Sequence, residues 1–537
     1  MGAGVLLDAV SRGLRAALVE QDDLAVGTSS RSSHLIHGGL RYLEQFDFGL
    51  VREALSERRR LLRLAPHLIR LEPFLFPIYS ALPGLGRAFY GSGLAIYDLL
   101  GAARDGGWAR HLGRSAVLEI VPDLHPNRLR GGIVYHDAIA DDARLVLAVV
   151  RAAVARGAIA VTRLGASGLL TDRAGHARGV QVIDRLSGDE FDIAGRHIID
   201  ATGVWAASRE SPFGRRALRL TPSRGSHVIV PRHRIQSQLG LTIRIPGRVV
   251  FVIPWTQFWI IGTTDELDAG APDRPAPTRG ELRELLGVVN QVLRIDLGPG
   301  DLVGAYAGLR PLVGMPRGST VRVSREHHVA VDRSGVVRVS GGKLTTYRVM
   351  ARDAVNAALG GDASRRPSAT EDLPLAGATE PAALGLLASE LARHFPLTPV
   401  TAERLVRRYG LDAERLVRLA AVGGRLSPLA PGIDAFEEEV VWAVREEYAL
   451  SLDDVLARRL WLTPTLPDRG AAIAPRVAAL MGAELGWDPA RQRDEVDSYL
   501  AMAHREYDVP AGEPGDAEQT ALGGADPMAA RAAPMNR

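Results

Sequence analysis

In the first part of the chain, segments whose apolar residues have helical spacing alternate with segments whose apolar residues have strand spacing. Residues 2–13 carry apolar positions at helical spacing, and the run RAALVE at 15–20 predicts a short strand that ends in an acid. A loop rich in serine and threonine follows at 27–33, and then a helix to about residue 66. Residues 133–161 predict a strand, a helix and a second strand, with Asp141 or Asp142 as the helix cap.

The period changes to two between about residues 164 and 267. Five apolar runs, separated by glycine, proline and aspartate, predict strands of one mixed sheet: GVQVIDRL, HIIDAT, HVIVP, VVFVIPW and FWIIGTT. Residues 336–342 predict another strand, which leads into a helix over about 343–359. Crossover units together with a mixed sheet indicate a fold of the α/β plus α+β class.

The last third of the chain has a different pattern. Residues 361–380 are rich in glycine, proline, serine and charge, which is typical of a linker. Helical spacing then predicts a separate helical domain over 381–508. Residues 509–537 are rich in alanine, glycine and proline and have no periodicity, so we expect a disordered tail.

Composition excludes several classes of function. The 537 residues contain no cysteine, which excludes disulfides, thiolate metal sites, iron–sulfur clusters and cysteine nucleophiles. Lys+Arg 65 nearly balances Asp+Glu 62, so no basic surface argues for a nucleic-acid partner. The sequence shows neither a secretory signal nor an apolar run long enough to span a bilayer. We therefore expect a cytoplasmic protein without a metal site.

The first helix begins with glycines, and an acid follows at the distance used in dinucleotide binding. In such a βαβ unit the helix N-terminus binds the pyrophosphate, and an acid about 20 residues later binds the ribose hydroxyls. Gly2 and Gly4 stand at the helix start, and Glu20 ends the strand. Gly2 would then be the last glycine of a GxGxxG motif whose strand and first glycines lie upstream of Met1. A helix that merely begins with glycine is the alternative.

The segment GTSSRSSHLIHGGLRYLE, residues 27–44, has the composition of a ligand-binding loop. Its hydroxyl groups can donate hydrogen bonds to phosphate oxygens: Thr28, Ser29, Ser30, Ser32 and Ser33. Gly38 and Gly39 permit close approach of the backbone to a planar ligand. Arg41 and Tyr42 add a fixed cation and a phenol. The alternative is a capped, solvent-facing turn with a locally paired arginine.

With these motifs the chain resembles the FAD-dependent glycerol-3-phosphate dehydrogenases of aerobic metabolism. Further segments of this family follow in order: DDARLVL (141–147), ATGVW (201–205), GSHVIVP (225–231), VFVIPW (250–255), IGTTD (261–265), YAGLRPL (306–312) and GGKLTTYR (341–348). The resemblance implies a Rossmann-like FAD-binding domain over residues 1–360, with an inserted mixed-sheet substrate (cap) domain at roughly 70–130 and 215–330. The helical C-terminal domain also fits the family.

The resemblance further implies which residues bind FAD. Besides Gly2, Gly4, Glu20, the hydroxyl residues of the loop, Gly38 and Gly39, they are Thr202, Gly203, Gly341, Gly342, Lys343, Leu344 and Thr345. Backbone N–H groups at the start of the last helix suit reduced flavin, which gathers negative charge, and Lys343 can supply a countercharge. A solvated lysine at a helix start is the alternative for Lys343.

The reaction implied is oxidation of glycerol 3-phosphate to dihydroxyacetone phosphate by hydride transfer to FAD. Arg41, Tyr42 and Arg310 resemble the substrate-phosphate cluster, with Arg325 as a fourth member. The hydroxyl proton needs an acceptor, for which His227 and His37 are the candidates. Arg310 polarising the alcohol, with water as the base, is the competing mechanism. His34 departs from the family, in which several members carry lysine.

Family members pass electrons to a membrane quinone. The amphipathic stretch 52–70 and the apolar stretch 74–103 can together rest on an anionic membrane, which implies a peripheral location on the inner face of the cytoplasmic membrane. A solvated helix face is the alternative. The motifs leave open a homodimer, a glycerol-3-phosphate oxidase that reduces oxygen, and an inactive flavin-free product if the first strand is absent.

Overall fold

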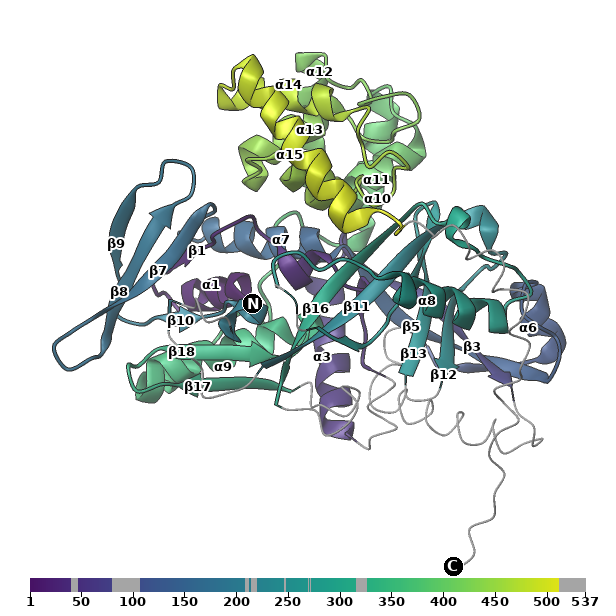
Figure 1. The fold of residues 1–537 in the computed structure, drawn as a ribbon, viewed down its shortest axis with the longest axis horizontal. Helices are drawn as coiled ribbons and strands as arrows, with labels where there is room; N and C mark the ends of the chain where they lie inside the picture. Colours follow the sequence, from purple (N-terminus) through teal and green to yellow (C-terminus); the bar gives the residue numbers. More distant parts are fainter. Residues whose placement is uncertain are drawn as a thin grey trace, which may run out of the picture.

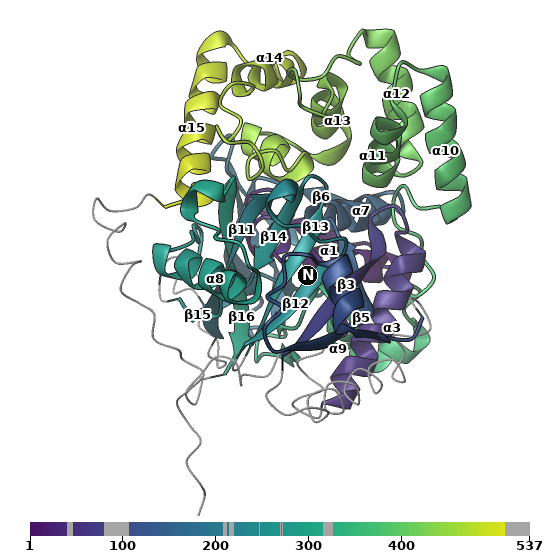
Figure 2. The same cartoon turned by 90° about the vertical axis from the view of Figure 1, so that its right-hand side faces the viewer.

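The computed structural model describes residues 1–39, 47–79, 107–207, 212–213, 220–245, 248–268, 270, 272–314 and 326–510. In both views the strands and the long helices α3, α7 and α9 form one mass, and a group of helices from the last third of the chain lies against it (Figures 1 and 2). Within the described ranges, no helix is long and apolar enough to cross a membrane.

The N-terminal helix α1 (Gly2–Ser11) packs between α7 (Asp142–Val154) and α9 (Tyr347–Leu359). Strand β1 (Ala17–Val19) pairs in parallel with β6 (Ile159–Val161). A second small sheet has the order β10-β18-β17, with the bounds Ile199–Asp200, Val337–Gly341 and His327–Val331. The parallel pairings β1·β6 and β10·β18 agree with the Rossmann-like fold that the resemblance implies.

Close contact of α1 with α9 requires a glycine. A Cβ atom built on Gly4 would lie 2.7 Å from Cδ2 of Tyr347 and 3.2 Å from Cβ of Ala351. Any larger residue would push the two helices apart. Gly4 therefore acts in helix packing at this contact.

Among the described residues, the largest sheet has ten strands. Its main order is β15-β11-β14-β13-β12-β3-β5-β2, while β16 pairs with β11 and β4 with β5. The bounds are Leu35–Ile36 (β2), Ile69–Tyr79 (β3), Arg110–Gly113 (β4), Leu129–Ala140 (β5), Leu220–Pro231 (β11), Gly240–Ile245 (β12), Arg248–Trp255 (β13), Phe258–Gly262 (β14), Glu266–Leu267 (β15) and Gly304–Val313 (β16). Helices α6 (Arg114–Ile120) and α8 (Arg279–Val292) share an apolar core with this sheet.

The prediction of one mixed sheet for the five apolar runs was wrong. The run GVQVIDRL lies in β8 (Ala177–Asp184), which pairs with β7 (Leu164–Thr171) and β9 (Glu190–Ala194) in a separate antiparallel sheet. The run HIIDAT contains β10, which pairs with β18 instead. Alternation identifies a strand and its buried face, but it does not identify the neighbouring strand.

Helix α3 (Phe48–Leu64) is more deeply packed than its many arginines suggest. Arg58 is fully buried and its Nη1 atom lies 2.9 Å from Oδ1 of Asp137, while Glu57 pairs with Arg348 at 2.6 Å. Arg52 and Arg63 are exposed. The start of the apolar stretch also lies inside the protein, since Phe74 and Leu75 belong to the core of β3. Residues 80–106 lie outside the described ranges.

The remaining helices form a group of their own (Figure 1). They are α10 (Pro381–His394), α11 (Pro399–Tyr409), α12 (Asp412–Gly423), α13 (Glu437–Glu447), α14 (Ala474–Leu485) and α15 (Pro489–Tyr507). A π-helical turn, Asp454–Arg459, lies between α13 and α14. The predicted linker contacts α1, because Arg12 donates from Nη1 to the carbonyl of Arg366 at 3.1 Å. Residues 511–537 of the predicted tail lie outside the described ranges.

Trp259 in β14 tests how much the core of the large sheet stabilises the protein. Its side chain is fully buried and donates from Nε1 to the carbonyl of Arg232 at 3.0 Å. We expect Trp259→Ala to lower the free energy of unfolding by about 3–5 kcal/mol, because it leaves a large cavity. Trp108 is 63% exposed, so Trp108→Ala should change the free energy of unfolding by less than about 0.5 kcal/mol. Urea titration of both variants measures the two changes, and equal losses of stability would contradict the prediction.

Candidate functional site

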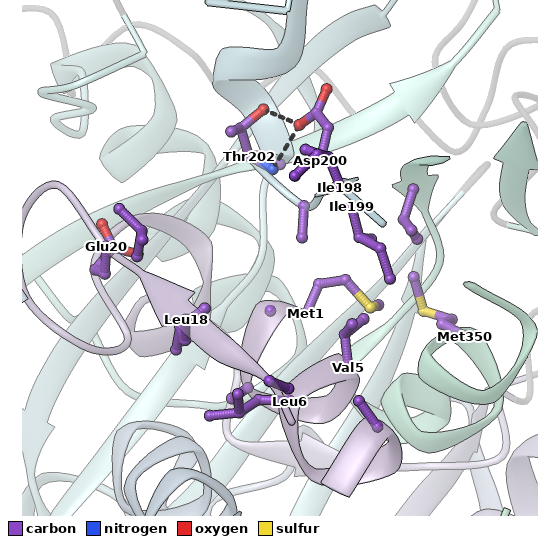
Figure 3. Close-up of a pocket in the computed structure, with 18 of the residues that line it drawn as sticks. Met1, Val5, Leu6, Leu18, Glu20, Ile198, Ile199, Asp200, Thr202 and Met350 are labelled. Atoms are coloured by element: carbon purple, nitrogen blue, oxygen red, sulfur yellow. Dashed lines mark hydrogen bonds between the residues drawn. The ribbon is translucent and has the colours of Figure 1, made fainter. Parts of the chain in front are cut away.

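A cavity of about 1630 Å³ lies between α1, β1, β10 and β18 (Figure 3). Pockets for drug-sized ligands have volumes of about 300–1,000 Å³, so this one has room for a larger ligand such as a dinucleotide. The close-up shows Leu18 and Glu20 on one side of the cavity and Ile199 and Thr202 on another, with Met350 at its edge. Loop ends and helix starts from distant parts of the sequence therefore surround one space.

The cavity brings together many residues that the motifs predict. Its lining includes Gly2, Glu20, Thr28, Ser29, Ser32, Thr202, Gly203, Arg310, Gly341, Gly342, Lys343 and Leu344. These residues come from α1, from the ends of β1, β10 and β18, from β16, and from the 3-10 turns Gly27–Ser30 (η1), Gly203–Ala207 (η3) and Leu344–Thr346 (η7). The carboxyl ends of parallel strands are the usual ligand-binding edge of an open α/β sheet.

Two glycines shape the turn between β18 and α9. Gly341 and Gly342 have φ angles of +70° and +74°, in the left-handed region that favours glycine. A Cβ on Gly342 would lie 2.3 Å from Sδ of Met350, and one on Gly341 would lie 2.7 Å from the carbonyl oxygen of Glu326. The turn can therefore bring its backbone, and the start of α9, to the cavity only because these positions have no side chain.

The turn after β10 is held by a carboxylate that the motif analysis did not single out. Oδ1 of Asp200 accepts hydrogen bonds from N and Oγ1 of Thr202 at 3.0 and 2.6 Å (Figure 3). Asp200 is buried and its Oδ2 lies 3.4 Å from Nη1 of Arg338. Arg338 in turn pairs with Asp332 at 2.8 Å. The acid directly before ATG was the signal in the sequence that could have indicated this role.

Glu20 lies at the cavity end of β1, where an acid is expected to bind ribose hydroxyls. Its Oε1 accepts a hydrogen bond from the backbone N–H of Asp22 at 3.0 Å. Burial raises the pKa of the Glu20 carboxyl to about 7, against the lowering effect of that hydrogen bond. The carboxyl is therefore partly protonated at neutral pH, and it can accept a hydrogen bond from a hydroxyl group or donate one to it.

Ser33 and His227 form a second group beside the cavity. Oγ of Ser33 lies 2.8 Å from Nε2 of His227, and the His227 ring stacks on Tyr306 with centroids 4.7 Å apart. Burial, then the charge of Arg310, and then His34 lower the pKa of His227 well below its ordinary value. His227 is therefore neutral at physiological pH.

The hydroxyl of Ser32 donates to Oδ2 of Asp142 at 2.7 Å, at the start of α7. Nδ1 of His34 lies 3.4 Å from Oδ1 of the same carboxylate, and its ring lies 4.4 Å from the Trp255 ring. His34 is thus a buried neighbour of a carboxylate. Ser30 and Thr345 are also buried, and neither lines the cavity.

Arg310 projects from β16 into the end of the cavity, and its guanidinium is anchored by neighbouring strands. Nη2 donates to Oγ1 of Thr263 at 2.9 Å, and Nη1 donates to Oγ of Ser223 at 3.3 Å. Asp265 lies 3.7 Å away. A Cβ on Gly225 would lie only 2.2 Å from Nη2, so a glycine in β11 makes room for this side chain.

The structure does not place every predicted site residue at the cavity. His37, Gly38 and Gly39 are described but are not part of the lining, and the His37 ring lies 6.3 Å from the Phe251 ring. Arg41, Tyr42 and Arg325 lie outside the described residues. In the part of the chain that the structure describes, no group of three His, Asp or Glu side chains is arranged to hold a metal ion.

Comparisons with known proteins agree with this geometry. Residues 1–348 match the family model of FAD dependent oxidoreductases, and residues 368–492 match the C-terminal domain of alpha-glycerophosphate oxidase. Glycerol-3-phosphate dehydrogenase 2 of Mycobacterium tuberculosis is 41% identical over 513 residues, which are 94% of this chain and 87% of that protein. The mitochondrial glycerol-3-phosphate dehydrogenase of Homo sapiens is 35% identical over 93% of this chain and 71% of its own.

One solved structure is similar over nearly the whole chain. It is glycerol-3-phosphate dehydrogenase from Bacillus halodurans, complexed with FAD, with a TM-score of 0.76 and 25% sequence identity. The similarity covers 94% of this chain and 92% of that one.

The raised pKa of Glu20 predicts a pH-dependent effect on stability. A carboxyl with a pKa of about 7 in the folded state and about 4.5 in the unfolded state destabilises the fold increasingly as pH rises from about 4.5 to 7. We therefore expect Glu20→Gln to raise the Tm of the flavin-free protein more at pH 8 than at pH 5. Differential scanning fluorimetry at the two pH values measures this. An equal shift at both would show that Glu20 does not titrate in this range.

Proposed function

The chain belongs to the family of FAD-dependent glycerol-3-phosphate dehydrogenases, and we propose that it oxidises sn-glycerol 3-phosphate to dihydroxyacetone phosphate. Family membership confirms the resemblance carried by the motifs and the assignment of FAD as the cofactor. The observation that carries the proposed reaction is the cavity, because Arg310 lines the same space as the residues assigned to the cofactor.

The residues around the cavity fit a flavin dinucleotide. The start of α1 at Gly2 suits the pyrophosphate, Glu20 suits the ribose hydroxyls, and Ser29 offers a hydroxyl group. The hydroxyls of Thr28 and Ser32 also line the cavity, but they donate to the Leu309 carbonyl and to Asp142. The glycine turn before α9 presents backbone N–H groups and Lys343. When bound, FAD supplies the hydride acceptor for oxidation at C2 of the substrate. Lys343, which lines the cavity, supplies a positive charge near the reduced ring in this proposal.

Arg310 is the proposed substrate-binding cation. Its guanidinium donates to the hydroxyls of Ser223 and Thr263 and to the Thr264 carbonyl, and it lies 3.7 Å from Asp265, so its position at the cavity is fixed. A fixed guanidinium binds a phosphate oxygen or polarises an alcohol without paying the entropy of ordering its side chain. The proposed phosphate cluster also includes Arg41, Tyr42 and Arg325, which lie outside the described residues.

The proton acceptor is proposed to be His227 or His37, with water beside Arg310 as the alternative. His227 is in its basic form at neutral pH because its pKa is lowered. Its Nε2 atom contacts Ser33, at 2.8 Å from the hydroxyl oxygen. Neither Ser33 nor His227 lines the cavity, so a proton relay through the Ser33 hydroxyl to His227 is part of the proposal, and burial opposes a lasting positive charge on the ring.

Quinone is the proposed electron acceptor, and the proposed location is cytoplasmic, peripheral on the inner face of the membrane. The names of the similar proteins, which are dehydrogenases, support an acceptor other than oxygen. The exposed Arg52 of α3 supports contact with an anionic surface, whereas the exposed Arg63 is paired with Asp372 at 2.8 Å. An oxidase that forms hydrogen peroxide is the second candidate, because the C-terminal model is named after one. A homodimer remains a further proposal.

The proposed reaction predicts a defined substrate selectivity. Purified protein should carry yellow flavin absorbance and reduce a redox dye with glycerol 3-phosphate, but not at comparable efficiency with glycerol or dihydroxyacetone phosphate. Oxygen consumption and peroxide yield, with and without a quinone analogue, then separate dehydrogenase from oxidase. Equal efficiency with free glycerol would contradict the phosphate-binding role. A preparation that reconstitutes no flavin would favour the inactive product.

Arg310→Met tests the proposed cation. Loss of a charge-assisted hydrogen bond to the substrate costs about 1.5–3 kcal/mol, so kcat/KM for glycerol 3-phosphate should fall by about 10- to 100-fold. The flavin absorbance spectrum should change little. Arg234→Met is the matched control, because Arg234 pairs with Asp301 on the surface of the same sheet domain and does not line the cavity. An unchanged kcat/KM in Arg310→Met would remove Arg310 from the mechanism.

A further inference from the structure

Helices of the last third of the chain contact the segment that carries the proposed cofactor hydroxyls. We call residues 23–34, between β1 and β2, the cofactor loop. Thr28, Ser29 and Ser32 of this loop line the cavity. We call residues 381–507, from α10 to α15, the helical group. In both views it lies directly against the part of the molecule that contains α1, α7 and β16 (Figures 1 and 2).

The first contact is a buried ion cluster at the start of the loop. Asp23 is fully buried, and its carboxylate accepts from Nε of Arg458 at 2.5 Å and from Nη2 of Arg459 at 2.7 Å. Both arginines belong to the π-helical turn Asp454–Arg459. Because a buried carboxylate must stay paired, this cluster fixes the start of the loop relative to the helical group.

The second contact holds the middle of the loop through Arg31. Its guanidinium forms an ion pair with Glu506 and lies over the Tyr507 ring at 5.3 Å, both at the end of α15. Nη1 of Arg31 also donates to the carbonyl of Pro275 at 3.2 Å. Arg31 directly precedes Ser32, so this contact constrains the backbone beside a residue that lines the cavity.

The third contact is aromatic and lies at the end of the loop. The ring of Trp461, just after the π-helical turn, meets the ring of His34 edge-on at 5.3 Å. Trp461 also lies 5.5 Å from Trp255 and 6.5 Å from Tyr306, whose hydroxyl donates to the carbonyl of Ser32 at 2.8 Å. The same helical group thus reaches both ends of the loop.

We propose that the helical group is a positioning element for the cofactor. The contacts at Asp23, Arg31 and His34 hold the cofactor loop in its binding conformation before FAD arrives, so less conformational entropy is lost on binding. The positioning residues are Arg458, Arg459, Glu506 and Trp461. None of them lines the cavity. The inference shares with the proposed function only the assignment of FAD as the ligand.

Asp23→Ala tests this proposal against a matched control, Glu447→Ala. Glu447 is also fully buried and joins the same two parts of the molecule, because its carboxylate pairs with Arg144 of α7 at 2.6 Å. It does not contact the cofactor loop, and its bonds to Arg459 come from its backbone carbonyl, which Glu447→Ala keeps. Both variants should lower the Tm. Only Asp23→Ala should weaken FAD binding, by about tenfold, while Glu447→Ala should stay within about twofold. Fluorescence titration of the flavin-free proteins with FAD measures both constants.

Trp461→Leu provides a second test that removes no charge. It should weaken FAD binding severalfold and leave the far-ultraviolet circular dichroism spectrum unchanged, so the proposal can be tested even if Asp23→Ala does not fold. Equal weakening in Asp23→Ala and Glu447→Ala, or wild-type affinity in Trp461→Leu, would overturn it. If the expected affinities are found but wild-type protein does not oxidise glycerol 3-phosphate, the proposed reaction fails and the positioning role stands.

Discussion

Buried charges between the helical group and the rest of the protein impose the strongest constraint on this structure. Asp23 and Glu447 are completely withdrawn from solvent, and each needs arginines from the other side of the junction. Arg144 and its neighbours hold the pKa of Glu447 below its ordinary value, although burial alone would raise it. Removing one partner of such a pair costs about 3–5 kcal/mol, because it leaves an uncompensated charge in a dry environment. The two parts are therefore fixed in relative position.

The residues fixed by these ion pairs are only a few positions along the chain from residues that line the cavity. Asp23 is only five residues before Thr28, and Arg31 adjoins Ser32. The cavity itself is formed by glycine turns and strand ends, which carry few side chains able to hold them in place. Asp200, which accepts two hydrogen bonds from Thr202, gives the same kind of support on the opposite side. Residues next to the cavity thus hold in place the glycine turns and strand ends whose backbone a dinucleotide would contact.

The two edges of the cavity differ in their electrostatic character. Arg310 and Lys343 bring positive charge to the part next to β16 and α9, whereas Glu20 marks the part next to β1. An anionic substrate is attracted to Arg310 and Lys343, whereas Glu20, whose pKa is raised to about 7, is only partly ionised at neutral pH. His227 adds no charge at neutral pH, because burial and Arg310 keep it neutral. The proposed reaction therefore begins with the cationic groups already in position.

The sequence by itself determined the local elements and the family. Periodicity located α1, α7 and the strand runs, and the motifs from Gly27 to Arg348 identified an FAD-dependent oxidoreductase. It also indicated many lining residues, such as Glu20, Thr202 and Lys343, since each stands in a motif with a known chemical use. Only the tertiary structure decided that GVQVIDRL forms a separate sheet, because strand pairing depends on distant partners. It alone showed that Gly4 serves helix packing and that Trp461 and Arg459 contact the cofactor loop, since these contacts join residues hundreds of positions apart.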